Sequence, residues 1–123
     1  MVRAGRLLDS CIDLSGANVC KPEWAYHDLL NISSSRFLRP VNKNKHINAL
    51  RLARIRTAMK TAAKANAGFH LWWHPHNFGK NLRENIGGLK HILDFYQTLE
   101  YKYGMKSLNM TEIHSTSSQI YDN

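Results

Sequence analysis

The run Phe69–Gly79 constrains this chain more than any other stretch, because an apolar segment changes abruptly into a cluster of histidines and turn-forming residues. If the apolar segment is a strand, alternation places Leu71 and Trp73 on one of its faces. Trp72 and His74 then share the opposite face. Both faces carry large apolar side chains, which is typical of a parallel strand that is covered on both sides.

The polar half of this run predicts a site at the end of the strand. Pro75 has no N–H to donate to a sheet, so the strand should end at His74. The residues His76, Asn77 and Gly79 then form a loop, since asparagine and glycine accept the backbone angles of tight turns. Ligands of α/β proteins bind at the carboxyl ends of strands, so this loop is a candidate pocket.

Three interpretations of the histidines remain open. A metal site is one, but His70 and His74 would lie about 13 Å apart on a strand that rises ~3.3 Å per residue. His74 and His76 could chelate together, although no Cys, Asp or Glu in the run completes a ligand set. The second interpretation is general acid–base chemistry by imidazole. The third is that each histidine is an ordinary core or loop residue.

The segment His70–Gly79 resembles the C-terminal signature of the polysaccharide deacetylase family, the NodB-homology type of carbohydrate esterase family 4. A late strand in that family carries a Leu-x-x-His motif, and the residues from Leu71 to His74 match it. The resemblance implies that His74 is the general acid for the leaving amine and that Leu71 lines the acetyl pocket. Downstream, residues 107–113 are similar to the family's closing segment.

The resemblance also implies a function and further site residues. The family activity is metal-dependent hydrolysis of N-acetyl groups on carbohydrates, a reaction at carbon–nitrogen bonds other than peptide bonds. Trp72 and Trp73 would shape the acetyl or sugar pocket, and His76 and Asn77 would orient His74 or contact the substrate. A divalent metal of the zinc type is expected for the complete family domain.

The early motifs of the family are missing from this sequence. It has no Asp-Asp pair, its only H-x-x-x-H is formed by His70 and His74, and Arg39 and Pro40 are adjacent where the family has Arg-x-Pro. We therefore expect no metal on this fragment and no turnover of chitooligosaccharides by it. A missing N-terminal half of the same domain is a possible partner. The alternative is a non-catalytic module that binds a carbohydrate or an anionic glycan.

The predicted fold class is α/β, namely the incomplete C-terminal part of a distorted (β/α) barrel. The chain has 123 residues, whereas complete barrels of this kind need roughly 200 or more. We divide it into an irregular segment with short helical pieces (residues 1–45), an α/β part (46–113) and a frayed tail (114–123). In the first segment, Pro22 would open one short helix.

Two long helices are predicted in the α/β part. The first spans residues 46–66, and its arginines, Arg51 and Arg54 among them, are assigned to the solvated surface. The second spans residues 82–103, with Asn81 and Glu84 as a capping box at its start and Gly104 at its end. Its apolar stripe is predicted to contain Leu82, Ile86, Leu89, Leu93, Tyr96 and Tyr103, with Ile92 and Leu99 at the sides. Residues 106–113 are expected to form a last strand.

Composition narrows the partners only slightly. The formal net charge is +8, which favours anionic surfaces, but no nucleic-acid-binding motif accompanies it, so that partner ranks last. Arg36 and Arg39 are weak candidates for a sugar carboxylate or phosphate, and His27 and Asp28 are weak candidates for polar site residues. The two cysteines are expected to be free thiols. Because no signal peptide or membrane span is recognised in the sequence, a cytoplasmic location is predicted.

Overall fold

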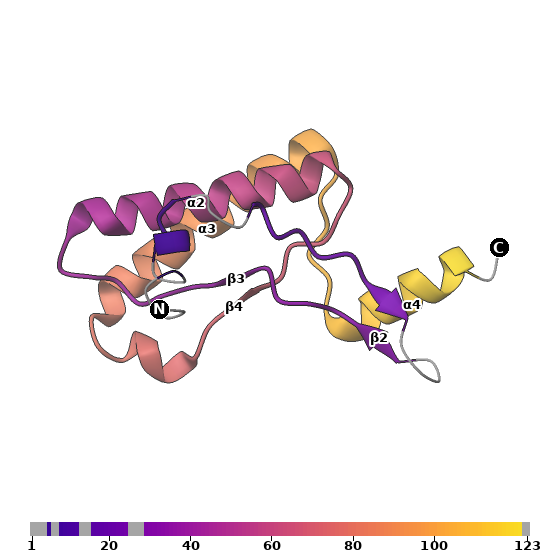
Figure 1. Cartoon of the computed structure of the whole chain (residues 1–123), viewed down its shortest axis with the longest axis horizontal. Coiled ribbons are helices and arrows are strands. Elements are labelled where there is room, and N and C mark those ends of the chain that lie inside the picture. Colours follow the sequence, from indigo (N-terminus) through magenta and orange to yellow (C-terminus); the bar gives the residue numbers. More distant parts are fainter. Residues whose placement is uncertain (1–4, 6–7, 13–15, 25–28, 122–123) are drawn as a thin grey trace.

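The computed structural model describes residues 5, 8–12, 16–24 and 29–121 (Figure 1). His27 and Asp28 lie outside these residues. The elements of the described residues, in chain order, are strands β1 (Glu23–Trp24), β2 (Leu30–Asn31) and β3 (Arg36–Phe37), helix α2 (Lys45–Lys64), strand β4 (Leu71–Trp72), the 3-10 helix η1 (Pro75–Phe78), and helices α3 (Leu82–Tyr103) and α4 (Met110–Tyr121).

The strands form two separate pairs. β1 and β2 are antiparallel, so a strand occupies the place where Pro22 was expected to open a helix. β3 and β4 are parallel, as predicted for the histidine-bearing strand, with Arg36 opposite Leu71 and Phe37 opposite Trp72. Parallel neighbours need a long connection, and α2 supplies it. The described residues close no barrel, so the chain's place in a larger barrel stays a prediction.

Helix α2 begins and ends close to the predicted residues. The side chain of Asn44 accepts hydrogen bonds from the backbone N–H groups of His46 and Ile47, which is how an N-cap residue satisfies the free donors of a first turn. The apolar side chains on the buried face of α2 follow spacings of three and four, as in an amphipathic helix. They are Ile55, Ala58, Met59 and Ala62.

Helix α3 begins and ends at the predicted residues, but its buried face is rotated from the predicted one. Ile92 and Leu99, expected at the sides, are each only 2% exposed. Leu93, expected at the centre of the stripe, is 53% exposed, and Leu82 and Ile86 are exposed as well. The core lies between α2 and α3 and is built from Leu38, Ile55, Met59, Phe78, Ile92 and Leu99. The half-buried Leu89, Tyr96 and Tyr103 pack against it.

The start of α3 differs from the predicted capping box. Asn81 has a left-handed backbone (φ 61°) and its side chain caps nothing, since an N-cap needs extended backbone angles. The end agrees with the prediction, because Gly104 has φ 68° and its N–H donates to the Glu100 carbonyl. Glycine is favoured there because it adopts a left-handed conformation without steric cost.

A helix stands where the last strand and the frayed tail were expected. The Glu112 N–H donates to Asn109 Oδ1 (2.9 Å), and the Asn109 N–H donates to Glu112 Oε2 (2.7 Å). This reciprocal pair is a capping box, and it starts α4 at Met110. α4 lies beside the β1–β2 pair at one end of the molecule (Figure 1), where the rings of Trp24 and His114 meet edge to face at 5.2 Å.

The connection after α2 is fixed to the N-terminal segment. Cys20 and Gly68 exchange two backbone hydrogen bonds, of 2.7 and 2.8 Å. A Cβ at position 68 would lie 3.0 Å from the Cys20 carbonyl oxygen, so only glycine allows this approach without a shift. Cys20 and Cys11 are both free thiols, as predicted. No helix in the described ranges is long and apolar enough to cross a membrane.

The alkaline stability of the fold should depend on Tyr96. Its hydroxyl has a single proton to share between two acceptors, Glu100 Oε1 (3.2 Å) and the Met105 carbonyl (3.3 Å). Burial, followed by the Glu100 carboxylate, raises the pKa of Tyr96 above its ordinary value of 10.0. The folded state therefore favours the neutral phenol, and this stabilisation is lost as the pH rises through the raised pKa. We expect the free energy of unfolding to fall above about pH 10, and Tyr96→Phe to reduce that fall in urea titrations.

Candidate functional site

Four ring side chains form a continuous row where β3 and β4 end. Phe37 contacts Trp72 (ring centroids 4.5 Å apart) and His74 (5.7 Å). Trp72 also meets His74 edge to face at 5.2 Å, and His74 stacks on His76 at 5.2 Å. We call Phe37, Trp72, His74 and His76 the aromatic row. Phe37 was not among the predicted site residues, and only its pairing with Trp72 reveals it.

The parallel strand pair determines which residues join the row. Because Phe37 lies opposite Trp72 in the register, their side chains emerge on the same face of the pair. The Leu38 N–H donates to the Trp72 carbonyl (2.8 Å), which holds the pair together at its carboxyl end. His74 follows two residues later and precedes Pro75, the first residue of η1. The predicted side-chain alternation is therefore present, but β4 ends at Trp72, two residues before the predicted end at His74.

The other predicted site residues lie elsewhere. Leu71 is half-buried and packs against the core cluster. Trp73 stacks on the buried ring of Phe78 at 5.9 Å, on the face away from Trp72. Asn77 lies in η1, where its backbone N–H donates to the His74 carbonyl (3.0 Å). The structure thus brings together Trp72, His74 and His76 of the predicted set and separates them from Leu71 and Trp73.

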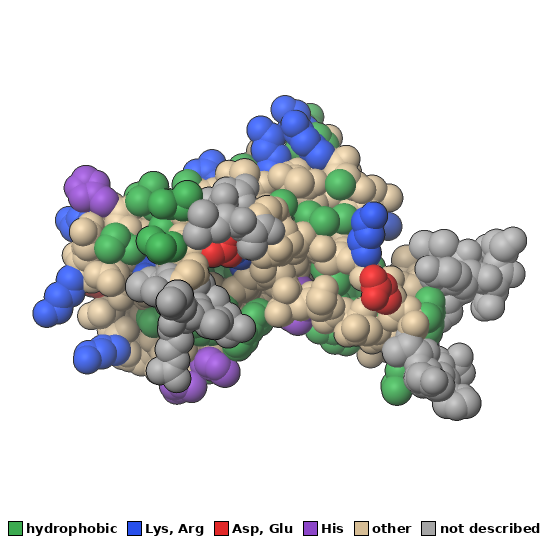
Figure 2. Space-filling model, in the orientation of Figure 1, with side chains coloured by type: hydrophobic (Ala, Val, Ile, Leu, Met, Phe, Trp, Pro, Cys, Tyr) green, Lys and Arg blue, Asp and Glu red, His purple; other side chains and the backbone are tan. Residues whose placement is uncertain are grey.

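One expectation about this strand is wrong, because only one of its faces is covered. Leu71 points to the core between α2 and α3, whereas Trp72 is 37% exposed and His74 and His76 are exposed too. The core cluster between the two long helices packs on the Leu71 face, and Phe37, the fourth ring of the row, is half-buried. Figure 2 shows histidine side chains at the edge of the molecule, over the segment where Figure 1 draws η1.

The residues around His74 do not fit the divalent metal of the complete family domain. Within the described part of the chain, no three His, Cys, Asp or Glu side chains converge. His74 and His76 supply two imidazoles, but their planes are only 22° apart in a stack. A structural or catalytic zinc site uses at least three protein ligands arranged around the ion. The row is therefore a surface of rings rather than a ligand set.

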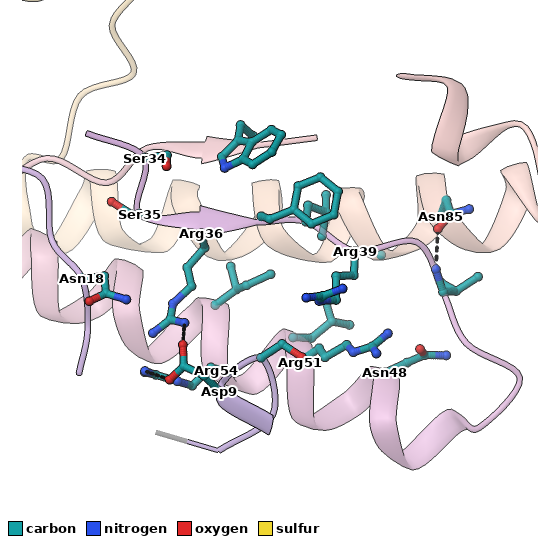
Figure 3. Close-up of a pocket in the computed structure, with 18 of the residues that line it drawn as sticks. Asp9, Asn18, Ser34, Ser35, Arg36, Arg39, Asn48, Arg51, Arg54 and Asn85 are labelled. Carbon is teal, nitrogen blue, oxygen red and sulfur yellow. Dashed lines mark hydrogen bonds and ion pairs between the residues drawn. The ribbon is translucent and has the colours of Figure 1, made fainter. Parts of the chain in front are cut away.

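A cavity of about 330 Å³ adjoins the row and shares Phe37 and Trp72 with it. Four arginines line it, two from β3 and the residues after it and two from α2, namely Arg36, Arg39, Arg51 and Arg54 (Figure 3). The prediction that Arg51 and Arg54 lie on the solvated surface is wrong for Arg54, which is 6% exposed, while Arg51 is half-buried. The N-terminal segment causes this burial, since Asp9 and Ser10 form part of the wall.

Asp9 is the carboxylate of the cavity and is already paired. Arg36 Nη1 lies 2.6 Å from Asp9 Oδ2, and Arg54 Nη2 lies 3.8 Å from Asp9 Oδ1 (Figure 3). Both guanidinium groups also donate to the Gly16 carbonyl. These contacts attach Asp9 and Gly16 to the side chains of Arg36 and Arg54.

Comparison of the chain with models of protein families, with curated proteins and with solved structures finds no match. The function of the aromatic row and of the cavity therefore has to be argued from their own chemistry.

Proposed function

We propose that this chain binds carbohydrate through the aromatic row, as the C-terminal portion of a polysaccharide deacetylase-like domain. The observation that supports the proposal is the continuous row of rings at the carboxyl end of a parallel strand pair, of which Trp72, His74 and His76 are exposed. The C–H groups of a sugar ring stack against an exposed aromatic face, and imidazoles exchange hydrogen bonds with the hydroxyl groups. The proposal includes a cytoplasmic location for the protein, which was predicted from the sequence.

The role of this chain in the proposal is binding, with His74 as the proton donor of a complete domain. By resemblance, His74 would protonate the amine that leaves when an N-acetyl group is hydrolysed. Its neighbours in the row are the rings of Phe37, Trp72 and His76, and no group of three metal ligands in the described ranges lies beside them to hold a metal-bound water. The chain alone is therefore proposed to bind N-acetylated oligosaccharides without turnover, and the remaining groups would come from the missing half.

Two adjacent tryptophans give this proposal a matched test. Trp72 and Trp73 are 37% and 36% exposed, but only Trp72 belongs to the row. We expect Trp72→Ala to weaken binding of a chitooligosaccharide by roughly fivefold, since a lost ring contact is worth about 1 kcal/mol. Trp73→Ala should leave the affinity within about twofold. Isothermal titration of each folded variant measures both values.

Three results would contradict the proposal. The wild-type chain could fail to bind the oligosaccharide, or the two tryptophan variants could lose affinity equally. The purified chain could also release acetate in the presence of zinc, which would overturn the binding-only role.

A stand-alone module for an anionic glycan is the second candidate, and the arginine-lined cavity beside Trp72 favours it. His74→Ala separates the two candidates once the missing half is supplied. The substitution should abolish turnover in a complete deacetylase. A module without catalysis should show no turnover with either the wild-type chain or the His74→Ala variant.

A further inference from the structure

The charges on the cavity wall are unbalanced. Four arginine side chains and one carboxylate, Asp9, stand among its described lining residues, a formal surplus of three positive charges. Asp9 is engaged by Arg36 and lies near Arg54. Arg39 and Arg51 form no ion pair within the described ranges (Figure 3). Figure 2 shows basic side chains spread widely over this face and few acidic ones, so no large acidic surface on this side offsets the surplus.

Buried donors add a second reason for an anion in this cavity. The Nε atoms of Arg36 and Arg51 are buried and have no hydrogen-bond partner in the described part of the chain. An unsatisfied donor on a charged group costs more free energy than a neutral one. A carboxylate or phosphate oxygen is the natural acceptor, because the planar guanidinium fork matches both groups.

The positions of Arg39 and Arg51 suit one bound group. Arg39 follows β3 and its Cζ lies 5.9 Å from the centroid of the Phe37 ring, so the aromatic row itself holds this guanidinium. Arg51 comes from α2, on the opposite wall. Figure 3 shows both side chains in the space between β3 and α2. An oxyanion between them would be held from two sides.

The other residues that line the cavity indicate which kind of molecule would carry the anionic group. Phe37 and Trp72 belong to both the cavity and the aromatic row, so a ring stacked on the row can extend an acidic substituent toward the arginines. The buried Ser35 adds a hydroxyl to the wall; its Oγ accepts a hydrogen bond from the His70 N–H (3.1 Å), which leaves its proton available to a ligand. The cavity volume is near the lower end, ~300 Å³, of ligand pockets, which limits the occupant to about one sugar unit.

We propose that the cavity binds the carboxylate or phosphate group of an acidic sugar, with Arg39 and Arg51 as the groups that contact the oxyanion. This inference rests on the proposed function, because the sugar ring is held by the aromatic row.

The test measures the affinity of the whole chain for glucuronate, glucose 6-phosphate, glucose and inorganic phosphate by isothermal titration. The two acidic sugars distinguish a carboxylate from a phosphate as the preferred group. We expect at least one of them to bind about tenfold or more tightly than glucose, as a charge-assisted hydrogen bond of roughly 1.5–3 kcal/mol allows. Arg51→Gln and, separately, Arg39→Gln should each remove that preference.

Arg83→Gln is the matched control, because it removes the same charge from an exposed position on α3 outside the cavity. It should leave the preference within about twofold. Equal losses in the Arg51 and Arg83 variants would overturn the inference, since they would indicate only a general attraction to a basic protein. A DNA duplex that binds more tightly than either acidic sugar, and independently of Arg39 and Arg51, would overturn it too.

The two proposals can fail separately. If the neutral chitooligosaccharide binds through Trp72 while acidic sugars bind no better than glucose, the acidic-sugar site is wrong and the carbohydrate function stands. If inorganic phosphate binds as tightly as glucose 6-phosphate and no neutral sugar binds, both proposals are wrong.

Discussion

Replacing Leu99 with alanine is expected to lower the free energy of unfolding by roughly 2–5 kcal/mol. Leu99 is 2% exposed and belongs to the core between α2 and α3. The truncation removes apolar contacts and leaves a cavity that the surrounding helices fill only in part. Urea denaturation followed by circular dichroism at 222 nm measures the loss.

Leu93 provides the control on the same helix, because it is the same residue type and 53% exposed. Leu93→Ala should change the free energy of unfolding by no more than about 0.5 kcal/mol. Similar losses for the two variants would mean that both faces of α3 are covered in solution. The exposed Leu82, Ile86 and Leu93 would then be an interface, and the size of the particle in solution should be measured next.

Replacing Asp9 with asparagine is the second large change. It leaves the buried guanidinium groups of Arg36 and Arg54, whose side chains are 9% and 5% exposed, without their carboxylate. Removal of one partner from a buried ion pair typically costs about 3–5 kcal/mol, because the remaining charge is desolvated and uncompensated. We expect Asp9→Asn to approach the lower end of that range in the same urea titration, since Asp9 itself is 18% exposed.

Asp94→Asn controls for the change in net charge, because Asp94 is exposed on α3 and is not among the residues that line the arginine cavity. Its effect should stay within about 0.5 kcal/mol. A double variant, Asp9→Asn with Arg54→Met, should recover part of the loss, since the buried charge is then removed together with its partner. An Asp9→Asn chain as stable as the wild type would mean that the N-terminal segment does not close the cavity in solution.

Local patterns in the sequence predicted the long helices well. The Asn-x-x-Glu spacing, however, marks a capping box at the start of one helix and not at the start of another. Asn109 and Glu112 form a capping box, whereas the identical spacing of Asn81 and Glu84 does not. The difference is the backbone of the first residue. Asn81 is left-handed, and the Asn-x-x-Glu spacing alone does not reveal that conformation.

Local sequence patterns could not predict the arginine-lined cavity, for a related reason. Helical spacing places Arg51 and Arg54 beside the apolar Leu52 and Ile55, but periodicity cannot say whether that flank meets solvent. Contacts distant in sequence decide it, such as the hydrogen bond from Arg54 to Gly16 across 38 positions. The aromatic row was easier, since strand alternation alone joins Trp72 to His74, and only Phe37 required knowledge of the strand pairing.

The opposite orientations of Trp72 and Trp73 have a spectroscopic consequence. Trp73, stacked on the buried Phe78, will change its fluorescence when the core opens. Trp72 is 37% exposed and in edge contact with His74, so a ligand that stacks on the row should change its fluorescence. Chains that lack Trp24 and keep only one of these two indoles therefore carry separate optical reporters for unfolding and for occupancy of the row, with no added label.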